Sequence, residues 1–123
     1  MSRPTTTGKV LEHYLEAHAS CDLETVVDLF CDDAVLEDPA GSEPHVGRAA
    51  IRAFFAASHR ENGRLAVERL SPVIGAGAEA ALHIRAATET ADYAFSVDVI
   101  YLVSLADDGR IASLRAFFEM PLA

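Results

Sequence analysis

The sequence lacks the features that mark nucleic-acid-binding and membrane-spanning proteins. Only 10 of its 123 residues are Lys or Arg, against 19 Asp or Glu, so the formal charge is −9 at pH 7, and the basic residues form no stripe. Such a chain is not expected to bind nucleic acid or an anionic membrane, and its charge favours a neutral ligand. No apolar run approaches the roughly 20 residues of a membrane span. Residues 1–9 also lack the apolar centre of a signal peptide, so we expect a cytoplasmic protein.

Motifs for metal, nucleotide and covalent chemistry are also missing. The two cysteines, Cys21 and Cys31, have no zinc-like spacing and are expected to be reduced. A helical pair of metal ligands needs an interval of four residues, whereas His13 and His18 are five apart. There is no glycine-rich phosphate loop and no serine-nucleophile motif. The sequence therefore predicts neither a metal site nor an organic cofactor.

What the chain does contain is 50% hydrophobic residues, enough for one domain over residues 1–123 with a substantial core. Apolar spacing predicts helices near residues 6–19, after Asp22 as N-cap, and near 48–59. Strands are predicted at residues 35–37, 65–74, 80–90, 93–105 and 111–118. Helices gathered ahead of an antiparallel sheet indicate an α+β fold in which the sheet wraps the helices.

An acid, Asp98, lies within the most apolar of these strands. Strict alternation places it on one face with Ile100 and Leu102, and we expect that face to be buried. A buried carboxyl would take up a proton and become a hydrogen-bond donor. Alternatively, Asp98 lies at a sheet edge or pairs with an arginine.

The opposite face of that strand is apolar as well, since it carries Val97, Val99 and Tyr101. No helix follows this part of the sequence to cover it. We therefore expect a second copy of the protein to cover it, giving a homodimer through the sheet.

Two further residues could bring polar chemistry into an otherwise apolar interior. Tyr14 belongs to the inward stripe of the first helix, where it is either a plain core ring or a hydroxyl donor. Asp38 ends a strand just before Pro39, where it either starts a turn or reaches into a cavity.

Together these residues resemble the bacterial ketosteroid isomerases, or steroid Δ-isomerases. The most specific stretch is Val-Leu-Glu-Asp-Pro-Ala-Gly-Ser-Glu-Pro at residues 35–44, followed by Gly47 and Ala-Ile-Arg-Ala-Phe at residues 50–54. Residues 28–34 and 113–118 also resemble the family, so the similarity extends from Val10 to Phe118.

The resemblance implies roles for three residues: Asp38 as general base, and Tyr14 and a protonated Asp98 as donors in an oxyanion hole. Ketosteroid isomerase is a well-known case of pKa tuning, and these roles come from the resemblance alone. The resemblance also implies a curved mixed, mostly antiparallel sheet wrapped around the N-terminal helices. The result is a cone with a deep apolar cavity, as in nuclear transport factor 2, and a homodimer.

The implied reaction converts β,γ-unsaturated 3-oxosteroids to the conjugated isomers. The expected steroid-binding residues are apolar: Phe54, Ile84, Ile100, Leu114 and Phe118. One departure is Phe55, which stands where the family often has a tyrosine that supports the catalytic tyrosine. Two alternatives stay open: cyclase or hydrolase chemistry on another polycyclic ketone, and a steroid- or lipid-binding module without turnover.

Overall fold

The described residues form three helices near the expected positions, two before the first strand and one after β2. The computed structural model describes residues 3–92 and 94–120. Helix α1 spans Arg3–Ala19, α2 spans Leu23–Asp28 and α3 spans Arg48–Asn62. Asp22 caps α2 as predicted, because its carboxylate accepts hydrogen bonds from the backbone N and the hydroxyl of Thr25. Among the described residues, no helix is long and apolar enough to cross a membrane.

The strands form one mixed sheet in the order β2-β1-β7-β6-β5-β3, with β4 paired to β5. Their bounds are β1 Phe30–Glu37, β2 His45–Val46, β3 Ala66–Arg69, β4 Ile74–Ala76, β5 Glu79–Glu89, β6 Ala94–Leu105 and β7 Ile111–Phe117. Among the described strands, β1 and β7 pair in parallel and the other pairs are antiparallel. The single strand expected at 65–74 is two short strands, and Tyr93, expected to begin the next one, lies outside the described residues.

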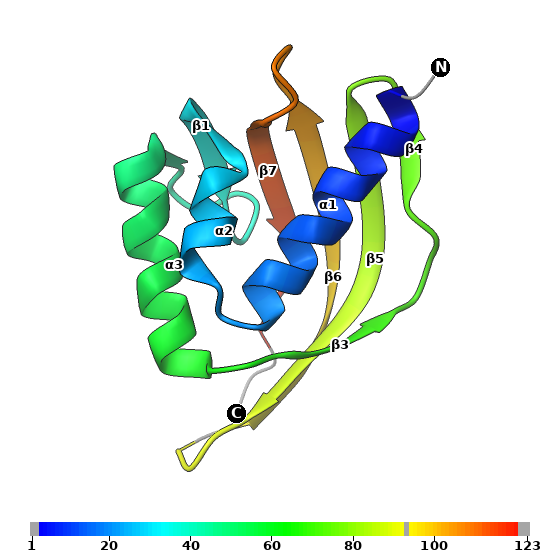
Figure 1. Ribbon diagram of the computed structural model, residues 1–123. Coiled ribbons are helices and arrows are strands. Elements are labelled where there is room, and N and C mark those ends of the chain that lie inside the picture. The colour runs from blue at the N-terminus through cyan, green and yellow to red at the C-terminus, as the bar shows by residue number, and fades with distance from the viewer. Residues whose placement is uncertain (1–2, 93, 121–123) are drawn as a thin grey trace.

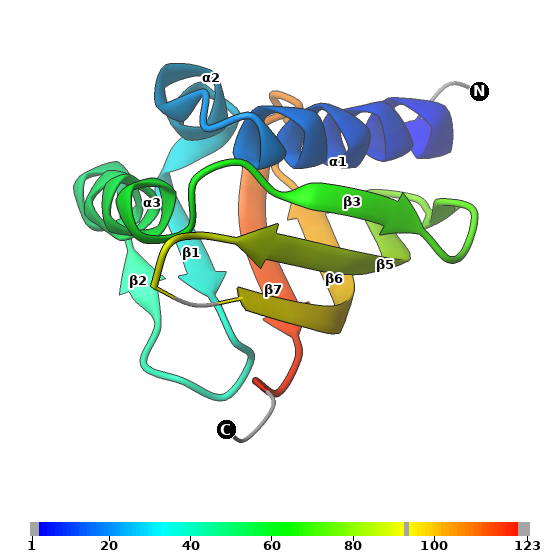
Figure 2. The ribbon, with the colours of Figure 1, turned by 90° about the horizontal axis from the view of Figure 1, so that it is seen from below.

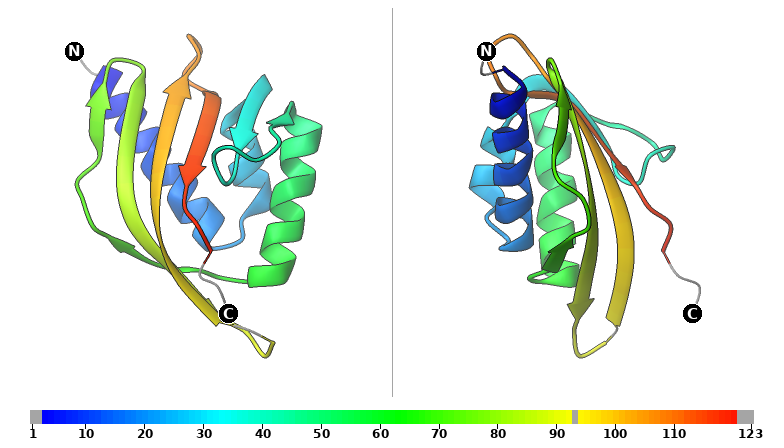
Figure 3. Two further views of the ribbon diagram at one scale, coloured as in Figure 1. Left: turned by 180° about the vertical axis from the view of Figure 1, so that it is seen from behind. Right: turned by 90° about the vertical axis from the view of Figure 1, so that its right-hand side faces the viewer.

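All three helices lie on one face of the sheet (Figures 1 and 2). The sheet curves, and its concave side faces the helices (Figure 3). The predicted α+β architecture is therefore confirmed. The other face of the sheet has no helix over it among the described residues.

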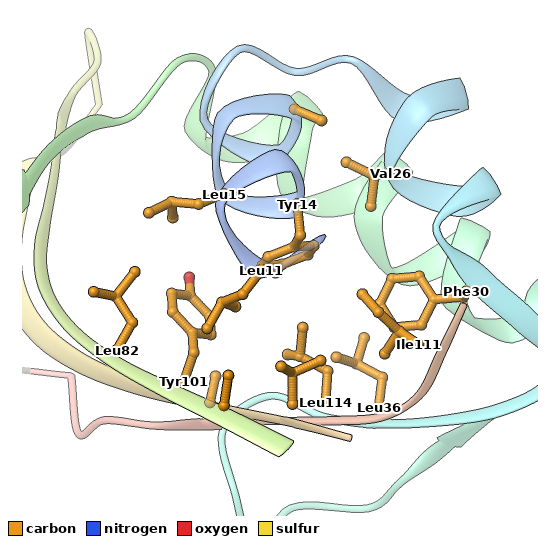
Figure 4. Packing of buried hydrophobic residues seen from close by; sticks show 14 of the residues in the cluster. Leu11, Tyr14, Leu15, Val26, Phe30, Leu36, Leu82, Tyr101, Ile111 and Leu114 are labelled. Atoms are coloured by element: carbon orange, nitrogen blue, oxygen red, sulfur yellow. The ribbon is translucent and has the colours of Figure 1, made fainter. Parts of the chain in front are cut away.

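The core fills the space between the helix layer and the sheet. Tyr14 from α1, Phe30 at the start of β1 and Phe55 from α3 are fully buried there, in one cluster with Leu and Ile residues of the sheet. Figure 4 shows Tyr14 and Phe30 within this cluster. Burying each such ring stabilises the fold by roughly 1.5–3 kcal/mol. This packing holds α1, which carries Tyr14, against β6, which carries Tyr101.

The inward face of β6 is the one opposite to our prediction. Val99, Tyr101 and Val103 point toward the helices and are buried, whereas Asp98 and Ile100 point outward. We expected a second copy of the protein to cover Val99 and Tyr101, but the chain's own helices cover them. Ile100 on the outer face is paired with Phe117 of β7, and both are exposed.

Candidate active site

A cavity of about 520 Å³ lies between helices α1 and α3 and strands β5 and β6 of the sheet. This volume is within the range of about 300–1,000 Å³ that is typical of small-molecule sites. Its polar lining residues come from helices, strands and the loop after β1: His18, Asp38, Ser58, Glu61, Asn62 and Tyr101. The cavity is therefore an apolar chamber with a few polar groups at defined places.

The apolar wall includes two of the five residues expected to bind substrate, Phe54 and Phe118. The other three are placed differently. Ile84 and Leu114 are fully buried core residues away from the cavity wall, and Ile100 is 47% exposed on the outer face. Ile100 lies outside because the face of β6 that points inward is the opposite of the one expected, and Ile84 and Leu114 pack in the closed part of the core. The remaining apolar lining comes largely from β6, through Phe95, Val97 and Val99.

Asp38 follows the last residue of β1 and reaches the cavity, as the sequence suggested. The Asp38–Pro39 peptide bond is cis. The loop behind it is held by the backbone N of Ala40, which donates to the carbonyl oxygen of Ala116 at 2.6 Å, and by the hydroxyl of Ser42, which donates to the carbonyl oxygen of Pro39 at 2.6 Å. These two contacts hold the loop that directly follows Asp38.

Neighbouring Glu37 and Asp38 have opposite surroundings. Glu37 accepts from the backbone N of Gly41 at 3.0 Å and from the guanidinium of Arg115 at 3.4 Å, and these contacts hold its pKa below the usual range. The Asp38 carboxyl has no hydrogen-bond partner within the described part of the chain, and burial in the cavity raises its pKa to about 7. It is reachable from the cavity yet surrounded by protein, so it can exchange a proton near neutral pH.

Two phenols lie close to this carboxyl group. Tyr14 of α1 and Tyr101 of β6 have ring centroids 5.6 Å apart in an edge-to-face arrangement. Figure 4 shows the Tyr101 ring extending from the sheet toward Tyr14. Burial raises the pKa of both phenols. The neighbouring Tyr101 and the charge of Asp38 raise the pKa of Tyr14 further, and the charge of Asp38 raises that of Tyr101, so both phenols are neutral at pH 7.

The two phenols differ in their contacts. Tyr101 forms part of the cavity wall, whereas the Tyr14 hydroxyl is buried and makes no hydrogen bond of good geometry with the described residues. Phe55, whose ring lies against Tyr14 at 5.9 Å between centroids, has no hydroxyl to offer it. The Tyr14 hydroxyl is thus enclosed by protein next to Tyr101 and does not line the cavity.

Asp98 is not in the cavity, contrary to the implied role of a protonated donor. It lies on the outer face, 53% exposed, where Arg85 Nε donates to it at 3.0 Å and His83 Nε2 lies 3.3 Å from it. Partial burial acts to raise its pKa, but the hydrogen bonds from Arg85 and His83 hold that pKa below the ordinary value. The arginine-paired alternative is therefore correct, and Asp98 is an ionised surface residue.

One residue of the cavity wall, His18, belongs to a histidine pair that was not predicted from the sequence. His18 Nδ1 lies 3.2 Å from His59 Nε2, and the His18 ring is stacked on Tyr14. Burial and the neighbouring His59 lower the pKa of His18 to about 4, so it is neutral at pH 7. Its place on the inward stripe of α1 was visible in the sequence, but its contact with His59, 41 residues away, was not.

No group of three or more His, Cys, Asp or Glu side chains within residues 3–92 and 94–120 could hold a metal ion. The structure does provide a carboxyl group and the Tyr101 hydroxyl in one apolar chamber, with the Tyr14 hydroxyl enclosed beside Tyr101. Such a site can remove a proton next to a carbonyl group and stabilise the resulting oxyanion.

Known proteins share this fold and sequence pattern. Residues 11–114 match the family described as the SnoaL-like domain. A steroid Δ-isomerase of Nocardioides simplex is 35% identical over 105 residues, which cover 85% of this chain and 83% of that protein. Epoxide hydrolase LasB of Streptomyces lasalocidi is 42% identical over 69 residues, 52% of this chain but only 24% of that protein.

Among solved structures, the epoxide hydrolase/cyclase-like enzyme SalBIII, described in pyran ring formation in the polyether salinomycin, superposes with a TM-score of 0.84. The two chains are 21% identical, and the match covers 97% of this chain and 95% of SalBIII. At that identity the match supports the fold alone. The fold and the cavity define a small α+β protein of the nuclear transport factor 2-like class.

Within that class, the chain belongs to the SnoaL-like domain family and is a ketosteroid isomerase-like member of it. The resemblance seen in the sequence is thereby confirmed. Its relatives include both an isomerase and epoxide hydrolases, so the family alone does not fix the reaction.

Proposed function

We propose that this protein isomerises β,γ-unsaturated 3-oxosteroids, or closely similar polycyclic ketones, to their conjugated isomers. The observation that carries the proposal is the unpaired Asp38 carboxyl, with a pKa of about 7, beside Tyr14 and Tyr101 in an apolar cavity. The 35% identity to a steroid Δ-isomerase supports the substrate class.

We place the substrate carbonyl oxygen against the Tyr101 hydroxyl in the cavity wall. To accept a hydrogen bond from Tyr14 as well, this oxygen must enter the enclosed space beside the Tyr14 hydroxyl. Ionised Asp38 removes a proton from carbon 4, and the electron pair of that C–H bond forms a dienolate with its negative charge on the oxygen. Protonated Asp38 then returns the proton to carbon 6, which leaves the double bond conjugated with the ketone. Tyr14 and Tyr101 stabilise the dienolate because they are neutral, fixed donors in a dry site.

This assignment moves the second donor role from Asp98 to Tyr101. A phenol in the cavity needs no unusual protonation state to donate a hydrogen bond at pH 7. The apolar wall, including Phe54 and Phe118, excludes water and packs against the polycyclic skeleton.

The direct test is an ultraviolet assay of the purified protein with a β,γ-unsaturated 3-oxosteroid, in which the conjugated enone absorbs as it forms. We expect turnover at catalytic protein concentration, reduced by about 10²-fold or more in Asp38→Asn, because the amide keeps the shape but not the base. Asp107→Asn, an exposed residue in the β6–β7 turn, is the control. Steroid binding without turnover in the unmodified protein would favour a binding module instead.

A second candidate reaction is epoxide opening, which the 42% identity to epoxide hydrolase LasB favours. There, a carboxyl group with a pKa near 7 would activate water or protonate the epoxide oxygen. Incubation with an apolar epoxide, followed by detection of the diol or cyclic ether, separates this candidate from the isomerase.

A further inference from the structure

The cavity has a second polar position beyond the base and the two phenols. His18 is one turn along α1 from Tyr14, and the two rings are stacked with centroids 5.6 Å apart. The charge of Asp38 acts on the pKa values of Tyr14 and Tyr101, whereas that of His18 is set by burial and by His59.

His18 presents one ring nitrogen to the cavity. The side chain is only 7% exposed, and its Nδ1 is occupied by His59 Nε2 at 3.2 Å. Its Nε2 has no hydrogen-bond partner within the described residues, and unlike His59 Nδ1 it is not sealed off by protein atoms. A buried polar nitrogen that faces a cavity without a partner needs one from the ligand.

The protonation of the pair follows from the buried nitrogen of His59. Neutral imidazole carries one N–H, and a buried N–H without a partner is rarer and costlier than a buried acceptor without one. His59 Nδ1 is buried and has no partner among the described residues, so we assign the hydrogen of His59 to Nε2, which then donates to His18 Nδ1. With Nδ1 as acceptor, neutral His18 carries its hydrogen on Nε2 and donates into the cavity.

We propose that His18 Nε2 donates a hydrogen bond to a second oxygen of the ligand, so that the ligand is a polycyclic ketone with a further hydroxyl or carbonyl oxygen. His59 is a positioning residue, because it fixes the tautomer and orientation of His18. The proposal rests on the proposed function for the placement of the first oxygen. The hydrogen bond from His18 adds selectivity for ligands with a second oxygen, which the base and the phenols alone do not provide.

The test compares binding of a 3-oxosteroid with that of matched steroids bearing one more oxygen at carbon 11 or carbon 17, measured by calorimetry. In the unmodified protein we expect at least one oxygenated steroid to bind about 3- to 10-fold tighter than its matched parent, the usual net effect of one hydrogen bond. His18→Leu should reduce that ratio to about one. His18→Gln, whose amide can place a donor near the Nε2 position, should restore part of it.

His13→Gln is the matched control, since His13 lies on the exposed side of α1. Nitrogen-15 spectra of the ligand-free protein add a readout independent of any steroid: we expect the hydrogen of His18 on Nε2, and a loss of that single tautomer in His59→Leu. A hydrogen on Nδ1 would overturn the assignment.

The outcomes separate the two proposals. Isomerase turnover together with equal affinity for all matched steroids would overturn the role of His18 and leave the isomerase standing. A His18-dependent affinity ratio without turnover would leave the second polar position standing and contradict the isomerase. Failure of every steroid to bind would contradict both.

Discussion

The raised pKa of Asp38 makes a prediction about stability that does not depend on knowing the substrate. The carboxyl has a pKa of about 7 in the folded protein against an ordinary value of 3.8, because burial disfavours its charged form. Between these two pH values the folded protein holds a proton that the unfolded chain has released. The stabilising contribution is therefore fully present below about pH 4 and is lost as the pH rises through 7.

The difference between the two pKa values corresponds to about 4 kcal/mol in the free energy of unfolding. Asp38 is partly accessible through the cavity, so we expect a measured loss of about 2–4 kcal/mol between pH 4 and pH 8. Asp38→Asn carries no titrating group. It should match the unmodified protein at pH 4 and exceed its free energy of unfolding by about 2–4 kcal/mol at pH 8.

Urea denaturation of both proteins at the two pH values measures this difference directly. Asp107→Asn is the matched control, because it makes the same change at an exposed carboxyl of the β6–β7 turn. The reasoning would be refuted if Asp38→Asn were no more stable than the unmodified protein at pH 8, or if it were stabilised equally at pH 4 and pH 8. A base that destabilises the fold at neutral pH is a common property of catalytic sites.

Three other predictions follow from the same geometry. Because the base must be ionised, kcat/KM should rise with pH to a plateau, with a midpoint near 7, and a midpoint near 4 would contradict the burial of Asp38. Tyr101→Phe and Tyr14→Phe should each lower turnover by about 10²- to 10³-fold in the enone assay. Asp98→Asn, on the outer face, should leave turnover within about twofold of the unmodified protein, and a large effect there would restore the sequence-based assignment. We also expect a homodimer through the outer face of β6 and β7, where Ile100 and Phe117 are paired and exposed. Phe117→Lys should therefore lower the mass measured by light scattering toward that of a monomer. A monomeric unmodified protein at micromolar concentration would contradict the dimer.

Much of the fold was readable from the sequence because its signals are local. The capping of α2 by Asp22 and the apolar stripe of α1 each depend on residues within one or two helical turns. The loop that places Asp38 was equally legible, since an Asp-Pro pair after a short apolar run ends a strand. These features needed no information on distant contacts.

The error at Asp98 arose because β6 is apolar on both faces, so alternation within the strand cannot tell which face is inward. Its neighbours across the sheet decide the question. Arg85 of β5 lies directly opposite Asp98, and Leu114 of β7 lies opposite Val103, so charged residues share the outer face and apolar residues the inner one. Alternating residues along β6 from Val103, which pairs with the inward Leu114, places Tyr101 on the inner face. Tyr101 is the residue that we propose as the second donor.

The histidine pair could not be predicted for a different reason. His18 and His59 are on separate helices, and their contact depends on how α1 and α3 pack over the sheet. A rule based on the spacing of residues along one helix cannot detect a pair whose members lie on two helices.

The central claim is that one carboxyl group moves a proton from carbon 4 to carbon 6 of a 3-oxosteroid. The most direct test uses a substrate with deuterium on carbon 4, converted in ordinary water and analysed by mass spectrometry and NMR. The account predicts a share of product with deuterium at carbon 6, because Asp38 keeps the abstracted deuteron in an apolar cavity during the short life of the dienolate. Product with only solvent hydrogen at carbon 6, or deuterium transfer that persists in Asp38→Asn, would contradict it.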